Sequence, residues 1–147
     1  MQFRLVLALA LTSLAACGMS YTLDEQEGVD AARAEFAAHG IAIGSTRPLG
    51  PVTVDDVAIT FTVDGWSLAD KLGFEYVAEH DPDFTLAATD LGVEVETAKL
   101  QAAVDSALEA EPGTHVLVLR TWGHETAGLA TEQLRRYVDQ WLLAQGR

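Results

Sequence analysis

The spacing of apolar positions predicts a helix that begins near residue 25. Val29, Ala32 and Phe36 recur at intervals of three and four residues, which is the spacing of one helical face. The segment Thr22-Leu23-Asp24-Glu25 has the pattern of a capping box, with the Thr at the helix start and the Glu reaching back to it. Gly40 is placed to end this helix.

A strand with one buried face is predicted over residues 57–63. Val57, Ile59, Phe61 and Val63 alternate with Ala58, Thr60 and Thr62, and this period of two is typical of a half-buried strand. Pro48 and Pro51 indicate a loop before the strand, and Asp64-Gly65 indicates its end.

A short helix and a hairpin are predicted after this strand, over residues 67–89. Ser67 to Leu72 is interpreted as a short helix. Phe74 to His80 and Phe84 to Thr89 are expected to pair as a hairpin around the turn Asp81-Pro82-Asp83.

A second helix and a second strand are predicted in the C-terminal half. The apolar stripe of the helix consists of Leu100, Ala103, Val104, Ala107 and Leu108. Glu94 and Glu96 suit the positive start of this helix, and Pro112-Gly113 stops it. Val116 to Leu119 are continuously apolar, which predicts a central strand covered on both faces or a strand deep in the core.

The last predicted element is a helix with apolar positions at Leu134, Val138, Trp141 and Leu142. The order of elements predicts an α+β fold in which about three helices pack on a small mixed sheet in a two-layer arrangement. An α/β fold with a mostly parallel sheet is the alternative. Residues 22–147 are expected to form a single acidic domain, because this length suits one core and no Pro, Gly or Ser tract could serve as a linker.

The charge of the chain narrows the choice of partners. From Cys17 onward, eight Lys and Arg stand against 22 Asp and Glu, so this part has a net charge of −14. A field of this sign repels phosphate backbones, and we therefore expect no nucleic acid as a partner. Anionic lipid head groups are disfavoured for the same reason.

The first sixteen residues have the layout of an export signal. Arg4 is their only charged residue, and the apolar run from Leu5 to Leu11 is far shorter than the roughly 20 residues that a membrane-spanning helix needs. Leu14-Ala15-Ala16-Cys17 follows, and Cys17 is the only cysteine, so no disulfide can form within the chain. These four residues resemble the lipobox of bacterial lipoproteins, the substrates of the lipoprotein signal peptidase.

The resemblance implies that residues 1–16 are removed and that Cys17 carries lipid. In that family a diacylglyceryl group is joined to the thiol and the new amino group is often acylated, so that two or three acyl chains hold the protein in a membrane. Residues 17–21 would then form a tether of at most about 14 Å. Gly18 stands where an Asp tends to retain such proteins in the inner membrane, which implies the outer membrane, facing the periplasm, if the source is Gram-negative. The alternative is an ordinary secretory signal cut elsewhere, for example after Gly18.

Common catalytic and metal-binding motifs are missing from the sequence. There is no Gly-rich phosphate loop and no Gly-x-Ser-x-Gly elbow. The segment His124 to Gly128 begins like a zinc-protease motif but has Gly where the second ligand should be. His115 and His124 flank a predicted strand, and roughly 25 to 30 Å of extended chain is too long for them to share a metal. His39 and His80 have no partner at ligand spacing, so we expect neither a metal nor a cofactor.

Acidic residues are concentrated in the middle of the chain. Asp81-Pro82-Asp83 could begin a calcium loop, but Leu86 and Gly92 stand where an EF-hand needs Gly and Glu, and a turn is the preferred interpretation. The other acids between Asp55 and Glu96 face only Lys71 as a counter-charge. They are interpreted as a solvated face, with binding of cations or small ligands as an alternative.

The segment from Trp122 to Glu125 contains the candidates for catalysis. If Val116 to Thr121 is a strand, the segment leaves its carboxyl end and leads into a helix, where ligands commonly bind in open α/β sheets. His124 and Glu125 could then act in acid–base chemistry. The preferred interpretation is a plain turn, with Trp122 in the core and His124 in solvent.

These observations favour a membrane-anchored envelope lipoprotein without catalytic activity, whose acidic domain binds another envelope protein. One alternative is a small periplasmic hydrolase or cell-wall-acting enzyme that uses His124 and Glu125. Another is a protein that captures cations or small ligands with its acidic region. A pocket that holds His124 beside two further polar groups would favour the enzyme, and an exposed flat or apolar patch would favour the binding protein.

Overall fold

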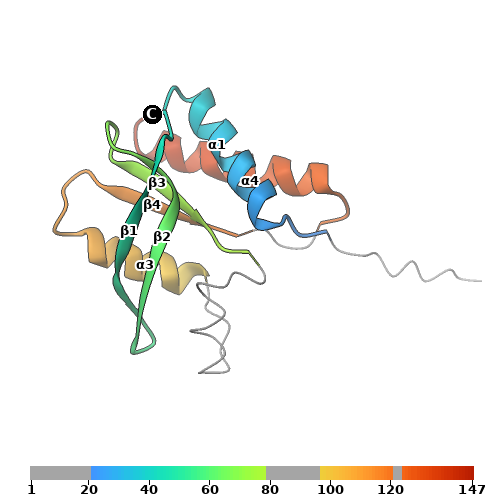
Figure 1. Cartoon of the computed structure of the whole chain (residues 1–147). Coiled ribbons are helices and arrows are strands. Elements are labelled where there is room, and N and C mark those ends of the chain that lie inside the picture. The colour runs from blue at the N-terminus through green and yellow to red at the C-terminus, as the bar shows by residue number, and fades with distance from the viewer. Residues whose placement is uncertain (1–20, 79–96, 121–123) are drawn as a thin grey trace, which may run out of the picture.

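The computed structural model describes residues 21–78, 97–120 and 124–147, which contain three helices and four strands (Figure 1). In chain order they are α1 (Glu25–Ala38), β1 (Ser45–Val54), β2 (Val57–Ser67), β3 (Leu72–Tyr76), α3 (Thr97–Leu108), β4 (His115–Leu119) and α4 (Ala127–Ala144). The strands form one sheet in the order β1-β2-β3-β4, in which β4 alone is parallel to its neighbour. The predicted α+β fold with a small mixed sheet is confirmed, and a mostly parallel sheet is wrong.

Helix α1 has its N-cap two residues later than predicted. Asp24 is the N-cap: its side chain accepts a hydrogen bond from the Glu27 N–H, and the Glu27 side chain accepts one from the Asp24 N–H. The capping box expected from Thr22 is therefore wrong in register. The hydroxyl of Tyr76 donates to the carbonyl of Leu23, which holds the chain ahead of Asp24 outside the helix. The helix ends at Ala38, just before Gly40, as predicted.

Strand β1 contains both prolines that were expected to mark a loop. Among the described strands it pairs with β2 alone, so it lies at an edge of the sheet, where a residue without a backbone N–H is tolerated. Its register shifts between Leu49 and Val52, around the cis Gly50-Pro51 bond. The loop predicted from Pro48 and Pro51 is therefore wrong, because an edge strand can accommodate both residues.

Strand β2 has the predicted alternation but continues past its predicted end. Ile59, Phe61 and Val63 are buried, and the residues between them are exposed. The strand does not stop at Asp64-Gly65, since residues 65–67 pair with β3. Glycine is required here because a Cβ at position 65 would lie 2.3 Å from the ring of Phe74.

A turn joins β2 to β3 in place of the predicted short helix. The Ser67 hydroxyl donates to the Asp70 carboxylate at 2.8 Å, and Lys71 has a left-handed conformation with φ 54°. Such side-chain bonds favour turns over helices. Strand β3 has β2 on one side and β4 on the other, so it leaves no free edge for the predicted hairpin. The other half of that hairpin, Phe84 to Thr89, lies outside the described residues.

Helix α3 buries most of its predicted stripe. Leu100, Val104 and Leu108 are buried and Ala103 packs against the core, whereas Ala107 is exposed. The helix ends at Leu108, before the predicted stop at residues 112–113. Glu94 and Glu96, predicted at its start, lie outside the described residues.

Strand β4 is covered on both faces, as predicted, but it is not central. It pairs only with β3 among the described strands, so it forms an edge of the sheet. The side-chain amide of Gln101 in α3 pairs with this edge, donating to the Val116 carbonyl at 2.9 Å and accepting from the Val118 N–H at 2.7 Å. A side chain thus satisfies backbone groups that a further strand would otherwise pair.

Different helices cover the two faces of the sheet. Val116 and Val118 belong to a core with α3 and the inward residues of β1 and β2, whereas Leu117 and Leu119 belong to a core with α1 and α4. Figure 1 shows α1 and α4 crossing side by side, with α3 apart from them. Around β3 and β4 the arrangement is therefore helix, sheet, helix, with one layer more than the two that were predicted.

Aromatic rings hold α1 against the sheet and α4. The ring of Phe36 lies 5.4 Å from that of Phe74 and 6.2 Å from that of Trp141. The ring of Tyr76 fills the space beside Gly28, where a Cβ would lie 2.4 Å from its atoms. The close approach of α1 to β3 therefore depends on a glycine in the middle of the helix.

Helix α4 closes the fold as predicted. Leu134, Val138 and Leu142 are buried, and Trp141 packs against the same core. Thr126 caps the helix, since its hydroxyl accepts from the Leu129 N–H at 3.2 Å.

Candidate functional site

The described chain begins at a two-way backbone pairing between Tyr21 and His124. The Tyr21 N–H donates to the His124 carbonyl at 2.6 Å, and the His124 N–H donates to the Tyr21 carbonyl at 2.8 Å. The Tyr21 hydroxyl donates to Glu27 at 2.6 Å, and this bond, together with the nearby carboxylates, raises the Tyr21 pKa above 10.0. Tyr21 is therefore fixed to both α1 and the residues before α4. Cys17, the predicted lipidation site, lies outside the described residues.

The catalytic candidates His124 and Glu125 are not brought together with a third polar group. The His124 Nε2 atom is buried without a hydrogen-bond partner. Glu125 is exposed, and the described structure gives its carboxylate no hydrogen bond or ion pair. Neither residue lines any of the four described hollows. The structure gives His124 a structural role, because its backbone pairs with that of Tyr21.

The acidic middle of the chain has more counter-charges than the sequence suggested. Asp55, at the tip of the β1–β2 hairpin, pairs with Lys99 of α3 at 2.8 Å, and Asp70 pairs with Arg147 at 3.0 Å. Lys71, the expected counter-charge, is exposed and directly follows Asp70 in the chain. The segment from His80 to Glu96, with the turn Asp81-Pro82-Asp83, lies outside the described residues.

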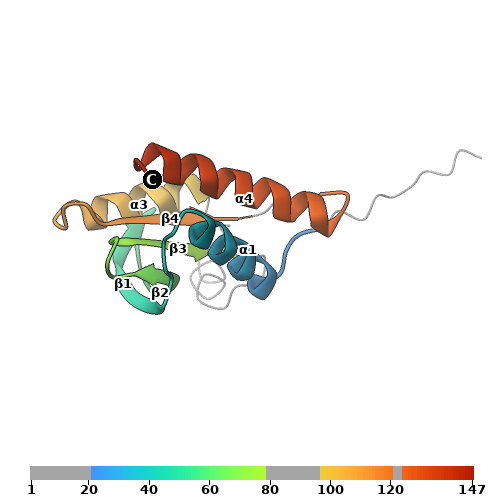
Figure 2. The same ribbon diagram turned by 90° about the horizontal axis from the view of Figure 1, so that it is seen from above.

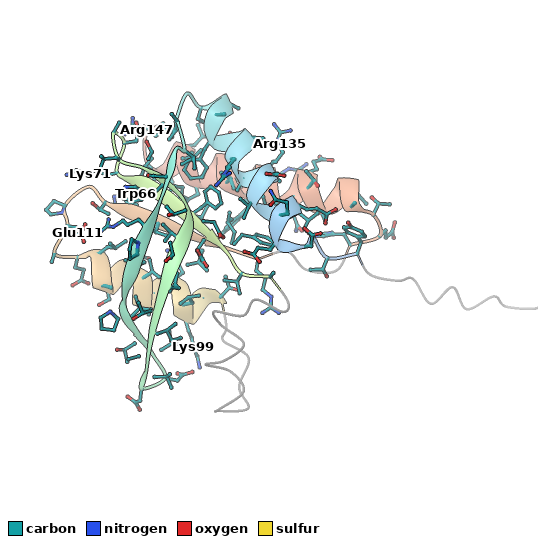
Figure 3. All side chains as sticks on the ribbon, viewed as in Figure 1. Trp66, Lys71, Lys99, Glu111, Arg135 and Arg147 are labelled. Carbon is teal, nitrogen blue, oxygen red and sulfur yellow. The ribbon has the colours of Figure 1, made fainter. Side chains whose placement is uncertain are left out.

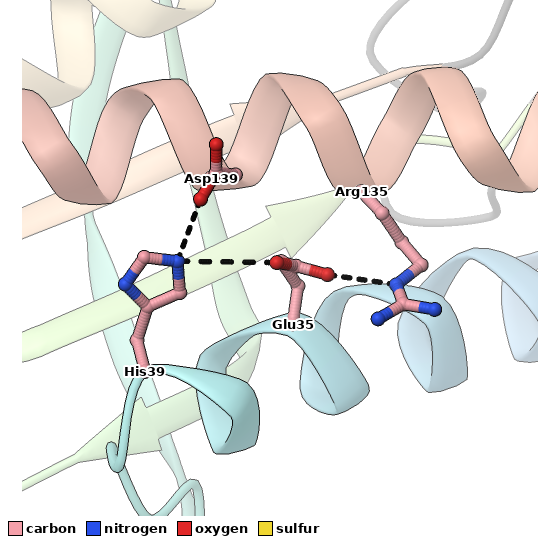
Figure 4. A network of polar contacts seen from close by, with 4 residues as sticks. All are labelled: Glu35, His39, Arg135 and Asp139. Carbon is pink, nitrogen blue, oxygen red and sulfur yellow. Dashed lines mark hydrogen bonds and ion pairs between the residues drawn. The ribbon is translucent and has the colours of Figure 1, made fainter.

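A polar cluster joins α1 to α4, and we call Glu35, His39, Arg135 and Asp139 the His39 cluster (Figure 4). His39 Nε2 lies 2.8 Å from Asp139 Oδ1 and 3.9 Å from Glu35 Oε1. The other oxygen of Glu35 accepts from Arg135 Nε at 2.7 Å. Glu35 and His39 have side chains only 13% and 15% exposed, whereas Asp139 is 40% exposed. The imidazole therefore faces two carboxylates in a half-buried setting.

This cluster was not predicted from the sequence, where His39 has no partner at ligand spacing. Glu35 and His39 are four residues apart, the spacing that brings side chains together on one helical face, and this signal was present. Asp139 lies 100 residues away from His39 in sequence, on another helix. No local pattern could have identified it, because the crossing of α1 and α4 creates the contact.

A hollow of about 620 Å³ lies beside Trp66, and we call it the Trp66 hollow. The guanidinium of Arg47 lies 4.8 Å from the centre of the Trp66 ring and donates to both carboxylate oxygens of Glu111, at 2.6 and 2.7 Å. Lys71 and Leu68 complete this side of the wall, and Leu68 is 80% exposed. The remaining lining residues are Ser45, Thr46, Pro48, Pro112 and Thr114.

The Trp66 hollow is far from the point where the described chain begins. In Figure 3, Trp66, Lys71 and Glu111 lie at one end of the molecule. Figures 1 and 2 show the chain entering at the opposite end, beside the starts of α1 and α4. The hollow therefore lies at the end of the molecule away from the starts of α1 and α4.

No helix in the described ranges is both long enough and apolar enough to span a membrane.

The contacts described above give two candidate sites, the His39 cluster between α1 and α4 and the Trp66 hollow beside β1 and β2. The chain matches no protein-family model, no curated protein and no solved structure.

Proposed function

We propose that this chain is a lipid-anchored protein of the bacterial cell envelope, and that its acidic domain is a non-catalytic module that binds another envelope protein. The anchor would be lipid on Cys17, and the bound partner would meet the Trp66 hollow. The outer membrane, facing the periplasm, is the proposed location in a Gram-negative source.

The observation that carries the proposal is the separation between the start of the described chain and the Trp66 hollow. Tyr21 is fixed to the fold by the His124 pairing, and it stands four positions after Cys17, a span of at most about 14 Å. One end of the domain would therefore be held close to the membrane. The Trp66 hollow, at the other end, would then face away from the lipid, where an envelope protein can reach it.

The lining of the hollow suggests the chemistry of the partner. In a chain of net charge −13, Arg47 and Lys71 supply two positive charges at one site, and Leu68 is an exposed aliphatic side chain next to them. Glu111 already pairs with Arg47, which leaves the Lys71 ammonium to meet a new anion. The best match is a protein segment that presents a carboxylate next to an apolar side chain.

A hydrolase based on His124 and Glu125 has less support. A general base must reach the proton that it abstracts, yet the His124 Nε2 atom is buried and makes no hydrogen bond. Neither residue lines a described hollow in which a substrate could bind.

The anchor is tested by Cys17→Ser in the native host. A serine has no thiol to be lipidated, so we expect loss of acyl-chain labelling, accumulation of the uncut precursor and release from the washed membrane fraction. The wild-type chain, labelled and fractionated in parallel, is the control. Normal cleavage and continued membrane attachment of the variant would contradict the lipid anchor.

The binding role is tested by placing a photo-crosslinking amino acid at position 68 of the full-length chain in intact cells. We expect one predominant protein adduct, which mass spectrometry can identify. The matched control carries the same group at Leu129, which is also an exposed leucine, at 47%, but lies at the start of α4, near the Tyr21 end. Equal adducts at both positions, or none at position 68, would refute binding at the Trp66 hollow.

A further inference from the structure

We infer that Glu35, His39 and Asp139 bind one divalent transition-metal ion between α1 and α4, and that Zn²⁺ fits this donor set best. The three side chains supply one imidazole nitrogen and two carboxylate oxygens, which is a ligand combination that zinc uses in proteins. The inference does not depend on the proposed anchoring or on the Trp66 hollow.

The three donor atoms are already close to the spacing that a zinc ion needs. All of them lie within 4.8 Å of one another, with His39 Nε2 at 2.8 Å from Asp139 and 3.9 Å from Glu35. Bonds of about 2.1 Å in a tetrahedron put ligand atoms about 3.4 Å apart. The two histidine distances therefore need to change by about 0.6 Å or less, and the distance between the two carboxylate oxygens, which is within 4.8 Å, by about 1.4 Å at most. Rotation of the carboxylates can supply such changes.

The backbone around these donors is held rigidly. Phe36, which follows Glu35, is fully buried against Phe74 and Trp141, and Val138, which precedes Asp139, is also fully buried. The donors thus project from fixed points on two packed helices, as a preorganised site requires.

Arg135 orients one of the ligands. Its guanidinium is not a metal ligand, but its Nε donates to Glu35 Oε2 at 2.7 Å. The other oxygen, Oε1, is therefore the one directed toward His39 (Figure 4). Outer partners of this kind fix the orientation of metal ligands in known sites. His39 itself caps the C-terminus of α1, where the helix dipole favours a positive charge.

Solvent reaches the cluster from one side. A hollow of about 510 Å³ adjoins it, lined by Glu35, Glu132 and Asp139 together with Arg135 and Arg136. This opening gives an ion a path of entry and leaves room for a water as the fourth ligand. The negative field of the whole chain raises the local concentration of cations at such an opening.

The protein is purified from cells that express the full-length chain and is treated with a chelator to remove bound metal. It is then titrated with ZnCl₂ in a calorimeter. We expect one Zn²⁺ per chain and a rise in Tm with added Zn²⁺, because an ion that binds only the folded state stabilises it by mass action. His39→Gln removes the nitrogen donor and should weaken binding about 100-fold or more, since even outer partners of metal ligands contribute 10- to 100-fold. His115→Gln, which changes an exposed histidine at the start of β4, should bind as the wild type does.

Asp139→Asn provides a second, independent variant, and it decides the question alone if His39→Gln fails to fold. It removes the charge of the most exposed ligand while keeping its size, and it should also weaken Zn²⁺ binding strongly. The inference is wrong if the wild type shows no saturable Zn²⁺ binding. It is equally wrong if both variants bind Zn²⁺ as tightly as the wild type does, because the ion would then lie elsewhere.

Discussion

The two faces of the sheet are both buried, but they are built from different kinds of contact. On the α3 face, aliphatic side chains such as Leu100 and Val104 pack against the alternating residues of the strands. On the α1–α4 face, the ring of Phe36 lies against those of Phe74 and Trp141, and the ring of Tyr76 is accommodated only because residue 28 is a glycine. Polar contacts differ as well, since Gln101 pairs with a strand edge on one side and the His39 cluster joins two helices on the other.

This difference separates general packing from specific fit. Aliphatic contacts tolerate volume-conserving changes, so the contacts of Leu100 and Val104 need hydrophobic residues more than particular ones. A ring placed against a glycine tolerates no added atom, so the α1–α4 face needs particular residues at particular positions. The candidate metal site lies at the rim of the more specific face.

The largest expected effect is the loss of an aromatic centre on the α1–α4 face. Phe36→Ala should reduce the free energy of unfolding by about 3–5 kcal/mol, because the ring is fully buried between Phe74 and Trp141. Urea unfolding followed by tryptophan fluorescence measures this value. Leu100→Ala on the α3 face, at about 2–5 kcal/mol, is the comparison. A clearly larger loss for Leu100→Ala would reverse the ranking of the two faces.

A smaller but more diagnostic effect is expected at the glycine of α1. Gly28→Ala places a Cβ 2.4 Å from the Tyr76 ring, and overpacking of this kind costs about 1–3 kcal/mol. Alanine gains about 1 kcal/mol over glycine in a helix, so the net result should be a moderate destabilisation. Gly44→Ala is the control, since no atom lies within 4 Å of its Cβ position. If Gly28→Ala stabilised the protein in thermal unfolding, the proposed close fit of α1 would be refuted.

The smallest expected effect concerns the edge of β4. Gln101→Ala leaves the Val116 carbonyl and the Val118 N–H without their side-chain partner, and we expect the free energy of unfolding to fall by about 0.5–1.5 kcal/mol in total. Chemical unfolding should register this loss, and hydrogen exchange of the Val118 amide should accelerate. Gln140→Ala, on an exposed position of α4, should leave both readouts unchanged. Unchanged exchange at Val118 in Gln101→Ala would show that the edge is protected by something else.

The sequence could predict those elements whose pattern is local. The alternation of Ile59, Phe61 and Val63 predicted the buried face of β2, and the stripe of Leu134, Val138 and Leu142 predicted α4. Both patterns predicted the structure correctly because the apolar character of each residue indicates that its side chain is buried. From these elements alone the α+β class followed correctly.

Predictions failed where the structural role of a residue depends on a partner that is distant in the sequence. Pro48 and Pro51 indicate a loop unless the strand lies at a sheet edge, and the strand order cannot be read from local sequence. Asp64-Gly65 resembles a turn, yet the glycine is there to accommodate the ring of Phe74 from the next strand.

The candidate sites show the same limit. His124 and Glu125 were selected because they follow a strand, but the backbone pairing of His124 with Tyr21 uses a residue from the other end of the domain. His39 received no partner although Glu35 was within one helical turn, because Asp139 completes the cluster from α4.

The pairing of Tyr21 with His124 also determines how the domain would respond to mechanical force. A pull on the chain ahead of Tyr21 loads the two backbone hydrogen bonds to His124 and the hydroxyl bond to Glu27 before it reaches α1. Next in line is the buried Leu23, whose carbonyl accepts from Tyr76 in the sheet. Force applied at this end is therefore shared between α4, α1 and β3, so that the first helix can stay wound while the outermost bonds yield.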